Sequence, residues 1–132
     1  MPEPVLVDTD VISFLFKQHP LAAGYSELLS GRNVLVSLAT SGEIEFGMLA
    51  AAWGPSRRDR MRQFLNEFTV LNPDSETARI WASVRFQCRK LGRTIAPTDA
   101  WIAATALQFS LALVTHNAGD YSSVEGLVIL RP

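Results

Sequence analysis

Four carboxylates occupy positions that a parallel β-sheet would bring to one edge. Asp8 directly follows the apolar run Val5-Leu6-Val7, and Glu43 lies near the start of the helix after the next such run. Asp99 lies in the first turn of a later helix, and Asp120 follows a third apolar run. Ligand sites of open parallel sheets lie beyond the carboxyl ends of the strands, so we expect the four side chains to meet there.

Such a cluster favours chemistry that uses a hard divalent cation. Carboxylates a few ångströms apart repel one another unless a cation lies between them. Oxygen ligands suit Mg²⁺ and Mn²⁺. One or two such ions can polarise a phosphodiester, lower the pKa of a bound water and stabilise the leaving oxygen. The cluster therefore predicts metal-dependent hydrolysis that needs no covalent nucleophile from the protein.

Each carboxylate also has a structural explanation that involves no ligand. These explanations are independent of one another, so four separate coincidences would be needed to place all four carboxylates at one sheet edge. A shared site explains the placement with one cause. The explanations are an N-cap of the next helix for Asp8 or Asp10, a capping box with Thr40 for Glu43, the helix dipole for Asp99, and a turn for Asp120.

Short apolar runs alternate with longer amphipathic segments along the chain. Runs rich in β-branched residues indicate buried strands, and spacings near 3.6 indicate helices. The alternation predicts one α/β domain over residues 1–132 with a mostly parallel sheet. The expected strands are 5–7, 34–36, 70–71, 112–114 and 127–130, and the expected helices are 11–16, 40–53, 55–68, 74–91 and 97–109.

Composition excludes several classes of protein. Of the 132 residues, 48% are hydrophobic and 19% are charged, which suits a packed core and argues against disorder. The single cysteine, Cys88, can form neither an internal disulfide nor a thiolate zinc site. The N-terminus does not resemble a signal peptide, and the longest uncharged stretch is too polar to span a membrane. We therefore expect a soluble, cytoplasmic protein.

Four segments resemble the motifs of PIN-domain ribonucleases, particularly the VapC toxins of prokaryotic toxin–antitoxin pairs. They occur in the order and spacing of that family between positions 5 and 121, and the four together are far more specific than any one alone. The segments are Val7-Asp8-Thr9-Asp10-Val11-Ile12-Ser13, Glu43-Ile44-Glu45-Phe46-Gly47, Pro97-Thr98-Asp99-Ala100-Trp101-Ile102-Ala103-Ala104-Thr105-Ala106 and Leu113-Val114-Thr115-His116-Asn117-Ala118-Gly119-Asp120-Tyr121.

The resemblance implies a single PIN-like domain, in which helices flank a five-stranded sheet in three α/β/α layers. It implies a Mg²⁺-dependent endoribonuclease in which Mn²⁺ can substitute. The metal-binding and catalytic acids would be Asp8, Glu43, Asp99 and Asp120, and the first and third of these are the expected direct ligands.

Three further polar residues receive supporting roles from the resemblance. Thr115 and Asn117 would orient Asp120 and the attacking water, and Thr9 would assist in a similar way. The alternative is that Thr115 and Asn117 only close a turn at the end of a strand. Asp10 falls where the family has Asn or Asp, so we do not expect its charge to be essential.

The resemblance also implies partners. These are an RNA substrate such as transfer RNA or ribosomal RNA, a second copy in a homodimer or a larger assembly, and a cognate VapB-type antitoxin whose C-terminal segment lies across the acidic groove. Tryptophan residues could supply a protein interface, with ordinary core packing as the alternative. They are Trp53, Trp81 and Trp101.

Charge is distributed unevenly, although the net charge is only −1. Residues 57–93 hold nine basic side chains and four acidic ones, so this third carries +5 and the remainder −6. Such segregation indicates a polyanionic partner, and two solvated helix faces are the alternative. The densest basic stretch could contact RNA phosphates or the antitoxin, and it comprises Arg57, Arg58, Arg60 and Arg62.

Other protein classes fit less well. Asp8-Thr9-Asp10 after a strand also suits a metal phosphatase of the haloacid dehalogenase type, but that chemistry needs a later lysine and none follows Lys90. A response-regulator receiver domain lacks the same lysine, and nucleotide-binding folds need a glycine spacing that is absent. A PIN module that only binds RNA or protein would lack one of the acids, and all four are present.

Overall fold

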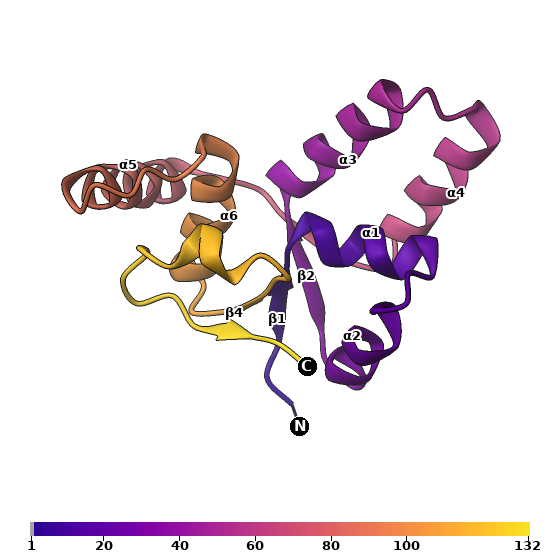
Figure 1. The fold of residues 1–132 in the computed structure, drawn as a ribbon, viewed down its shortest axis with the longest axis horizontal. Coiled ribbons are helices and arrows are strands. Elements are labelled where there is room, and N and C mark those ends of the chain that lie inside the picture. Colours follow the sequence, from indigo (N-terminus) through magenta and orange to yellow (C-terminus); the bar gives the residue numbers. More distant parts are fainter. Residues whose placement is uncertain (1) are drawn as a thin grey trace.

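Five short strands form one sheet in the computed structural model, which describes residues 2–132 (Figure 1). Their order is β3-β2-β1-β4-β5, and every neighbouring pair is parallel, which confirms the predicted sheet. The strand order reverses between β1 and β4, and such a reversal is where open α/β sheets place their ligand sites. The strands are β1 (Val5–Val7), β2 (Val34–Ser37), β3 (Thr69–Leu71), β4 (Ala112–Val114) and β5 (Ile129–Leu130).

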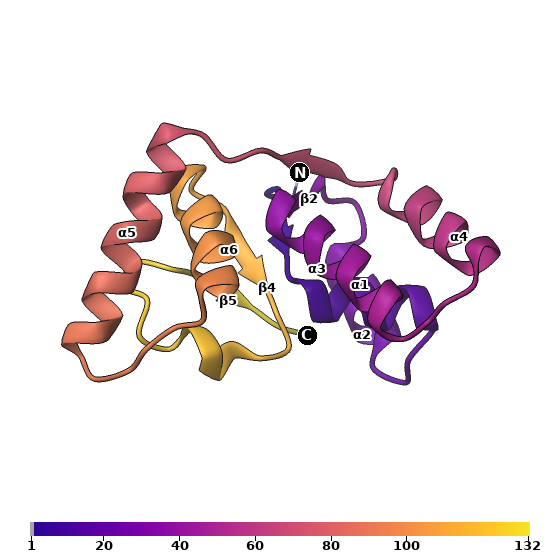
Figure 2. The same cartoon turned by 90° about the horizontal axis from the view of Figure 1, so that it is seen from above.

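Helices cover both faces of the sheet, as the three-layer prediction requires (Figures 1 and 2). Helices α5 and α6 lie side by side on one face, and α1 to α4 lie on the other. None of the helices described within residues 2–132 is long and apolar enough to cross a membrane. The helices are α1 (Thr9–Lys17), α2 (Ala22–Leu29), α3 (Leu38–Ala50), α4 (Pro55–Leu65), α5 (Ser75–Lys90) and α6 (Pro97–Gln108).

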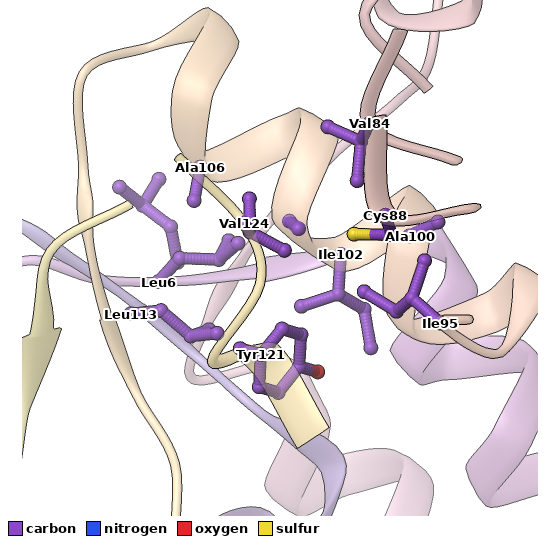
Figure 3. Close-up of a cluster of buried hydrophobic side chains, with 12 residues drawn as sticks. Leu6, Val84, Cys88, Ile95, Ala100, Ile102, Ala106, Leu113, Tyr121 and Val124 are labelled. Carbon is purple, nitrogen blue, oxygen red and sulfur yellow. The ribbon is translucent and has the colours of Figure 1, made fainter. Parts of the chain in front are cut away.

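Alternating side chains along the strands divide the core into two clusters. Val5 and Val7 of β1 are fully buried in the cluster beneath α1 to α4. Leu6, between them, is fully buried in the other cluster, where it lies with Ile102 and Tyr121 (Figure 3). Since successive residues of a strand point to opposite faces, one short central strand contributes to both layers.

Local sequence signals fix where α3, α5 and α6 begin. The Ser37 side chain caps α3, and Asp74 and Thr77 form a reciprocal capping box at the start of α5. Pro97 is the first residue of α6, a position where the missing N–H of proline costs no hydrogen bond. Asp99 therefore lies in the first turn of α6, as predicted.

The fold differs from the expected elements at α2 and β3, and both α4 and β5 are shorter than expected, at Pro55–Leu65 and Ile129–Leu130. The sequence does not predict α2, because its eight residues are preceded by Pro20 and only Tyr25 and Leu29, one turn apart, mark a buried face. The apolar run 70–71 predicts a buried strand, but Thr69 and Val70 are exposed because β3 is an edge strand. Short helices and edge strands carry too few buried positions to produce a clear pattern.

Candidate active site

Asp8 is held at the carboxyl end of β1 by three hydrogen bonds. Its Oδ1 accepts the backbone N–H of Thr9 at 2.8 Å. Its Oδ2 accepts the hydroxyl of Thr115 at 2.8 Å and that of Tyr121 at 3.0 Å. Asp8 is 6% exposed and also N-caps α1, so its structural explanation holds as well. Because both lone pairs of Oδ2 are occupied, Oδ1 is the oxygen with capacity for a further ligand.

Tyr121 connects two of the predicted acids. Its hydroxyl lies 3.0 Å from Asp8 Oδ2 and 3.4 Å from Asp99 Oδ1, while its ring is buried in the cluster of Figure 3. Burial and the two nearby carboxylates raise the pKa of Tyr121, so the phenol remains a donor. Tyr121 is not among the predicted site residues. The aromatic residue that ends the fourth motif is the signal that points to it.

Burial and the negative charges of the other predicted acids raise the pKa of Asp99. Burial is the largest cause that raises its pKa, which reaches about 6. The negative charges that add to this effect belong to Asp8, Asp120 and Glu43, in that order. These contributions show that Asp8, Asp120 and Glu43 all lie near Asp99 at the sheet edge.

Glu43 reaches this region from the first half of α3. Its Oε1 accepts the hydroxyl of Thr9 at 2.6 Å, and this hydroxyl also lies 3.2 Å from that of Thr40. The capping box considered for Thr40 and Glu43 is wrong, because α3 begins at Leu38 and Ser37 is its cap. The hydrogen bond from the Thr9 hydroxyl orients Glu43 instead.

Asp120 is the exposed member of the four. It lies on a short 3₁₀ helix, Ala118–Tyr121, so the turn considered for this position is also present. Asp120 and Asp99 line a surface cavity of about 580 Å³, and Arg93 forms part of the same wall. This cavity gives solvent and a ligand access to these two carboxylates.

Thr115 and Asn117 lie at the site, but they contact acids other than the one expected. Thr115 donates to Asp8, and the side-chain amide of Asn117 donates to Asp10 Oδ2 at 2.9 Å. The backbone N–H of Asn117 also donates to the Thr115 hydroxyl at 3.1 Å, so the two close the turn after β4. Strand β4 pairs with β1, and residues that follow β4 therefore meet residues that follow β1 rather than the side chain of Asp120.

Asp10 connects the loop after β4 to α1 through hydrogen bonds. Besides Asn117, its Oδ2 accepts the backbone N–H of His116 at 3.1 Å, and its Oδ1 accepts the N–H of Val11 at 2.7 Å. Burial and then the charge of Asp8 raise the pKa of Asp10, and the backbone hydrogen bonds oppose that shift. Its carboxylate is thus engaged within the protein.

The donor set fits a hard divalent cation. Asp8, Glu43, Asp99 and Asp120 offer only oxygen, and the pKa of Asp99 is raised by burial first and then by the negative charges of the other three. Among residues 2–132, no three carboxylate, imidazole or thiol groups already converge in an arrangement that holds a metal ion. Carboxylates without a cation between them are expected to stay apart. Asp8, through Oδ1, and Asp99 are the residues that would hold the ion.

The predicted basic stretch lies on α4, on the other side of α3 from α6 (Figure 2). Its four members are not equivalent. Arg62 forms a two-pronged ion pair with Glu45, at 2.8 and 2.9 Å. Arg58 is half-buried, and its Nε is enclosed without a hydrogen-bond partner in the described part of the chain. Arg57 and Arg60 are exposed.

Known proteins share both the motifs and the fold. The PIN domain model matches residues 5–126. Ribonuclease VapC5 of Mycobacterium tuberculosis is 30% identical over 102 residues, which cover 76% of this chain and 75% of that protein.

Two solved structures superpose along nearly the whole chain. VapBC-1 from nontypeable Haemophilus influenzae gives a TM-score of 0.81 at 25% identity and covers 96% of both chains. VapBC-5 from Mycobacterium tuberculosis, of the VapBC family of toxin–antitoxin systems, gives 0.78 at 27% identity and covers 99% of this chain and 100% of that one. The chain therefore belongs to the PIN domain family, among relatives of the VapC type, which confirms the family that its four motifs indicate.

Proposed function

We propose that this protein is a metal-dependent endoribonuclease that acts as the toxin of a toxin–antitoxin pair. The observation that carries the proposal is the Tyr121 hydroxyl between Asp8 and Asp99, which places two carboxylates from different elements on one donor at the sheet edge. Mg²⁺, or Mn²⁺ in its place, would be held by these two acids together with Glu43 and Asp120. When bound, the ion supplies a water of lowered pKa and charge stabilisation for phosphodiester hydrolysis.

The protein's own residues keep the acids in position. Thr115 and Tyr121 hold one oxygen of Asp8, and Thr9 holds Glu43. Asp99 must release its proton before it can bind a cation. Its pKa of about 6 means that it is largely ionised at neutral pH, so a cation can bind without a large proton penalty.

The partners that we propose are RNA, a VapB-type antitoxin and a second copy of this chain. The names of the related proteins, Ribonuclease VapC5 and the VapBC toxin–antitoxin systems, support the RNA substrate and the antitoxin. Helix α3 exposes Phe46 and Leu49, at 73% and 64% exposure, and this apolar surface supports a protein partner. Family membership favours this function over the haloacid-dehalogenase-like phosphatase.

The test is cleavage of purified transfer RNA and total RNA in Mg²⁺, Mn²⁺ or excess EDTA, with protein that mass spectrometry shows to be free of antitoxin. We expect discrete fragments that require a metal ion and disappear when purified antitoxin is added. Antitoxin-free, folded protein that yields no metal-dependent fragments would overturn the enzymatic proposal and favour a PIN module that only binds.

A further inference from the structure

We infer that Lys17, Trp53 and Arg57 form a docking platform for a single-stranded segment of RNA beside the carboxylates. The three residues come from the end of α1, the loop after α3 and the start of α4, and they are called the platform below. The inference rests on the proposed ribonuclease function and deepens it, because it assigns the surface that holds the substrate away from the cleaved bond.

Two cations share the indole of Trp53. The guanidinium carbon of Arg57 lies 3.7 Å from the ring centroid, and the Lys17 ammonium lies 5.8 Å from it. Phe16 stacks with the same indole at 5.8 Å and an interplanar angle of 24°, and it packs in the core beneath α1 to α4. The ring is therefore anchored, and it holds Arg57 in a defined orientation.

The positive charges of the platform are available to a ligand. Within residues 2–132, no carboxylate oxygen lies within 4.0 Å of the charged group of Lys17 or Arg57, and both residues are exposed. Arg62, on the same helix as Arg57, is neutralised by Glu45. A guanidinium stacked on an aromatic ring keeps its N–H donors at its edge, where they match the oxygens of a phosphate.

The platform is within reach of the carboxylates. Helix α1 begins at Thr9, next to Asp8, and ends at Lys17. At about 1.5 Å per residue, these eight steps place Lys17 about 12 Å from Thr9 along the helix axis. Figure 1 shows α1 running from the sheet edge towards α4. An RNA strand that lies at the carboxylates and follows α1 therefore meets the platform within a few nucleotides.

The chemistry of the platform favours single-stranded RNA over an acidic peptide. Sites that bind single strands use cations that contact the phosphates of the backbone, and the platform presents two exposed cations beside one anchored ring. The neighbouring carboxylates also fit a substrate whose phosphates bring a cation, whereas an acidic peptide would add repulsion. We therefore assign the platform to RNA.

The experiment measures binding of a fluorescein-labelled single-stranded RNA to the full-length Asp99→Asn protein by anisotropy over a range of KCl concentrations. We expect the added double substitution Lys17→Gln and Arg57→Gln to weaken binding about tenfold at low salt. It should also lower the slope of log Kd against log salt by about 1.4, because two phosphate contacts are lost. The matched control is Arg79→Gln, which removes an exposed arginine paired with Glu76 on α5 and should leave both values within about twofold.

Two results would overturn the platform. One is an unchanged affinity and slope in the double variant while wild-type protein still cleaves RNA, which leaves the proposed function intact. The other is a loss of antitoxin affinity with no loss of RNA affinity, which assigns the surface to an acidic peptide. Failure of the proposed function is a separate result. It would be an absence of RNA cleavage by the wild-type protein, and it does not depend on how the double variant binds RNA.

Discussion

Tyr121 donates its phenol hydrogen to Asp8 across 3.0 Å, with both side chains buried. The second donor to the same carboxylate oxygen is the hydroxyl of Thr115. Neutral hydroxyls, rather than basic side chains, therefore fix Asp8, and they leave its negative charge in place. A carboxylate held in this way is rigid yet still attracts a cation, which is the property that a metal site needs.

Replacing Tyr121 with Phe should weaken metal binding about tenfold. The substitution keeps the ring in the core but removes the donor between Asp8 and Asp99, and residues that orient ligands change metal affinity by about 10- to 100-fold. Isothermal titration of Mn²⁺ into folded protein measures the effect. The control is Tyr25→Phe, which removes a buried hydroxyl that contacts His116 instead. Equal Mn²⁺ affinity in wild type and Tyr121→Phe would refute a positioning role for this hydroxyl.

The raised pKa of Asp99 predicts that the metal-free protein loses stability as pH increases. The folded protein keeps this proton up to a pKa of about 6, whereas the ordinary pKa of a free aspartate carboxyl is 3.8. The stabilising contribution is therefore complete below pH 3.8 and is lost as pH rises through about 6. Asp10, whose pKa is also raised, adds to the same trend.

Melting temperatures in EDTA measure this dependence. We expect a lower Tm at about pH 7.5 than at about pH 5, and a smaller difference in Asp99→Asn, whose side chain does not ionise. Saturating Mg²⁺ should restore much of the loss at the higher pH, because the ion binds the ionised carboxylates of the folded state. A wild-type Tm that increases over this interval in EDTA would contradict the assignment.

Ile102 should be among the most costly positions to truncate. Its side chain is fully buried between α6 and the sheet, in the cluster that also holds Leu6 and Tyr121 (Figure 3). Ile102→Ala should lower the free energy of unfolding by about 2–5 kcal/mol, as measured by urea denaturation. Leu91→Ala is the control, since this residue is 60% exposed and its loss should cost less than about 0.5 kcal/mol. Comparable losses in the two variants would show that the packing of this cluster is not as described.

The sequence predicts the sheet and the grouping of the four acids because both depend on local order. Buried runs such as Val5–Val7 mark the strands, and Asp8 and Asp120 follow such runs in the chain. The carboxyl ends of parallel strands share one edge of the sheet whatever the strand order, so carboxylates that follow those ends lie in one region.

Contacts that depend on the order of the strands are not available from the sequence. Thr115 meets Asp8, rather than supporting Asp120, because β4 pairs with β1. Tyr121 looks like one more core aromatic until the fold brings its hydroxyl between Asp8 and Asp99. Both contacts join residues far apart in the chain, and hydrophobic periodicity cannot predict them because it reports only local structure.

The number of charges in a segment also does not show which of its arginine residues is free to bind an anion. Arg57 and Arg62 lie five positions apart in the same basic stretch. Only the fold shows that Arg62 is paired with Glu45 while Arg57 is stacked on Trp53. These differences in neighbours, rather than the net charge of the segment, decide which arginine is free to bind an anion.

The central claim is that the carboxylates at the sheet edge cleave RNA with a bound divalent ion, and substitution of two of them tests it most directly. Rates of cleavage of one labelled RNA in Mg²⁺ should fall at least about 100-fold in Asp8→Asn and in Asp99→Asn, because each change removes a charged ligand of the ion. Glu67→Gln, a change at an exposed residue in the turn between α4 and β3, should cleave at the wild-type rate. Undiminished cleavage by both folded Asn variants would contradict the account.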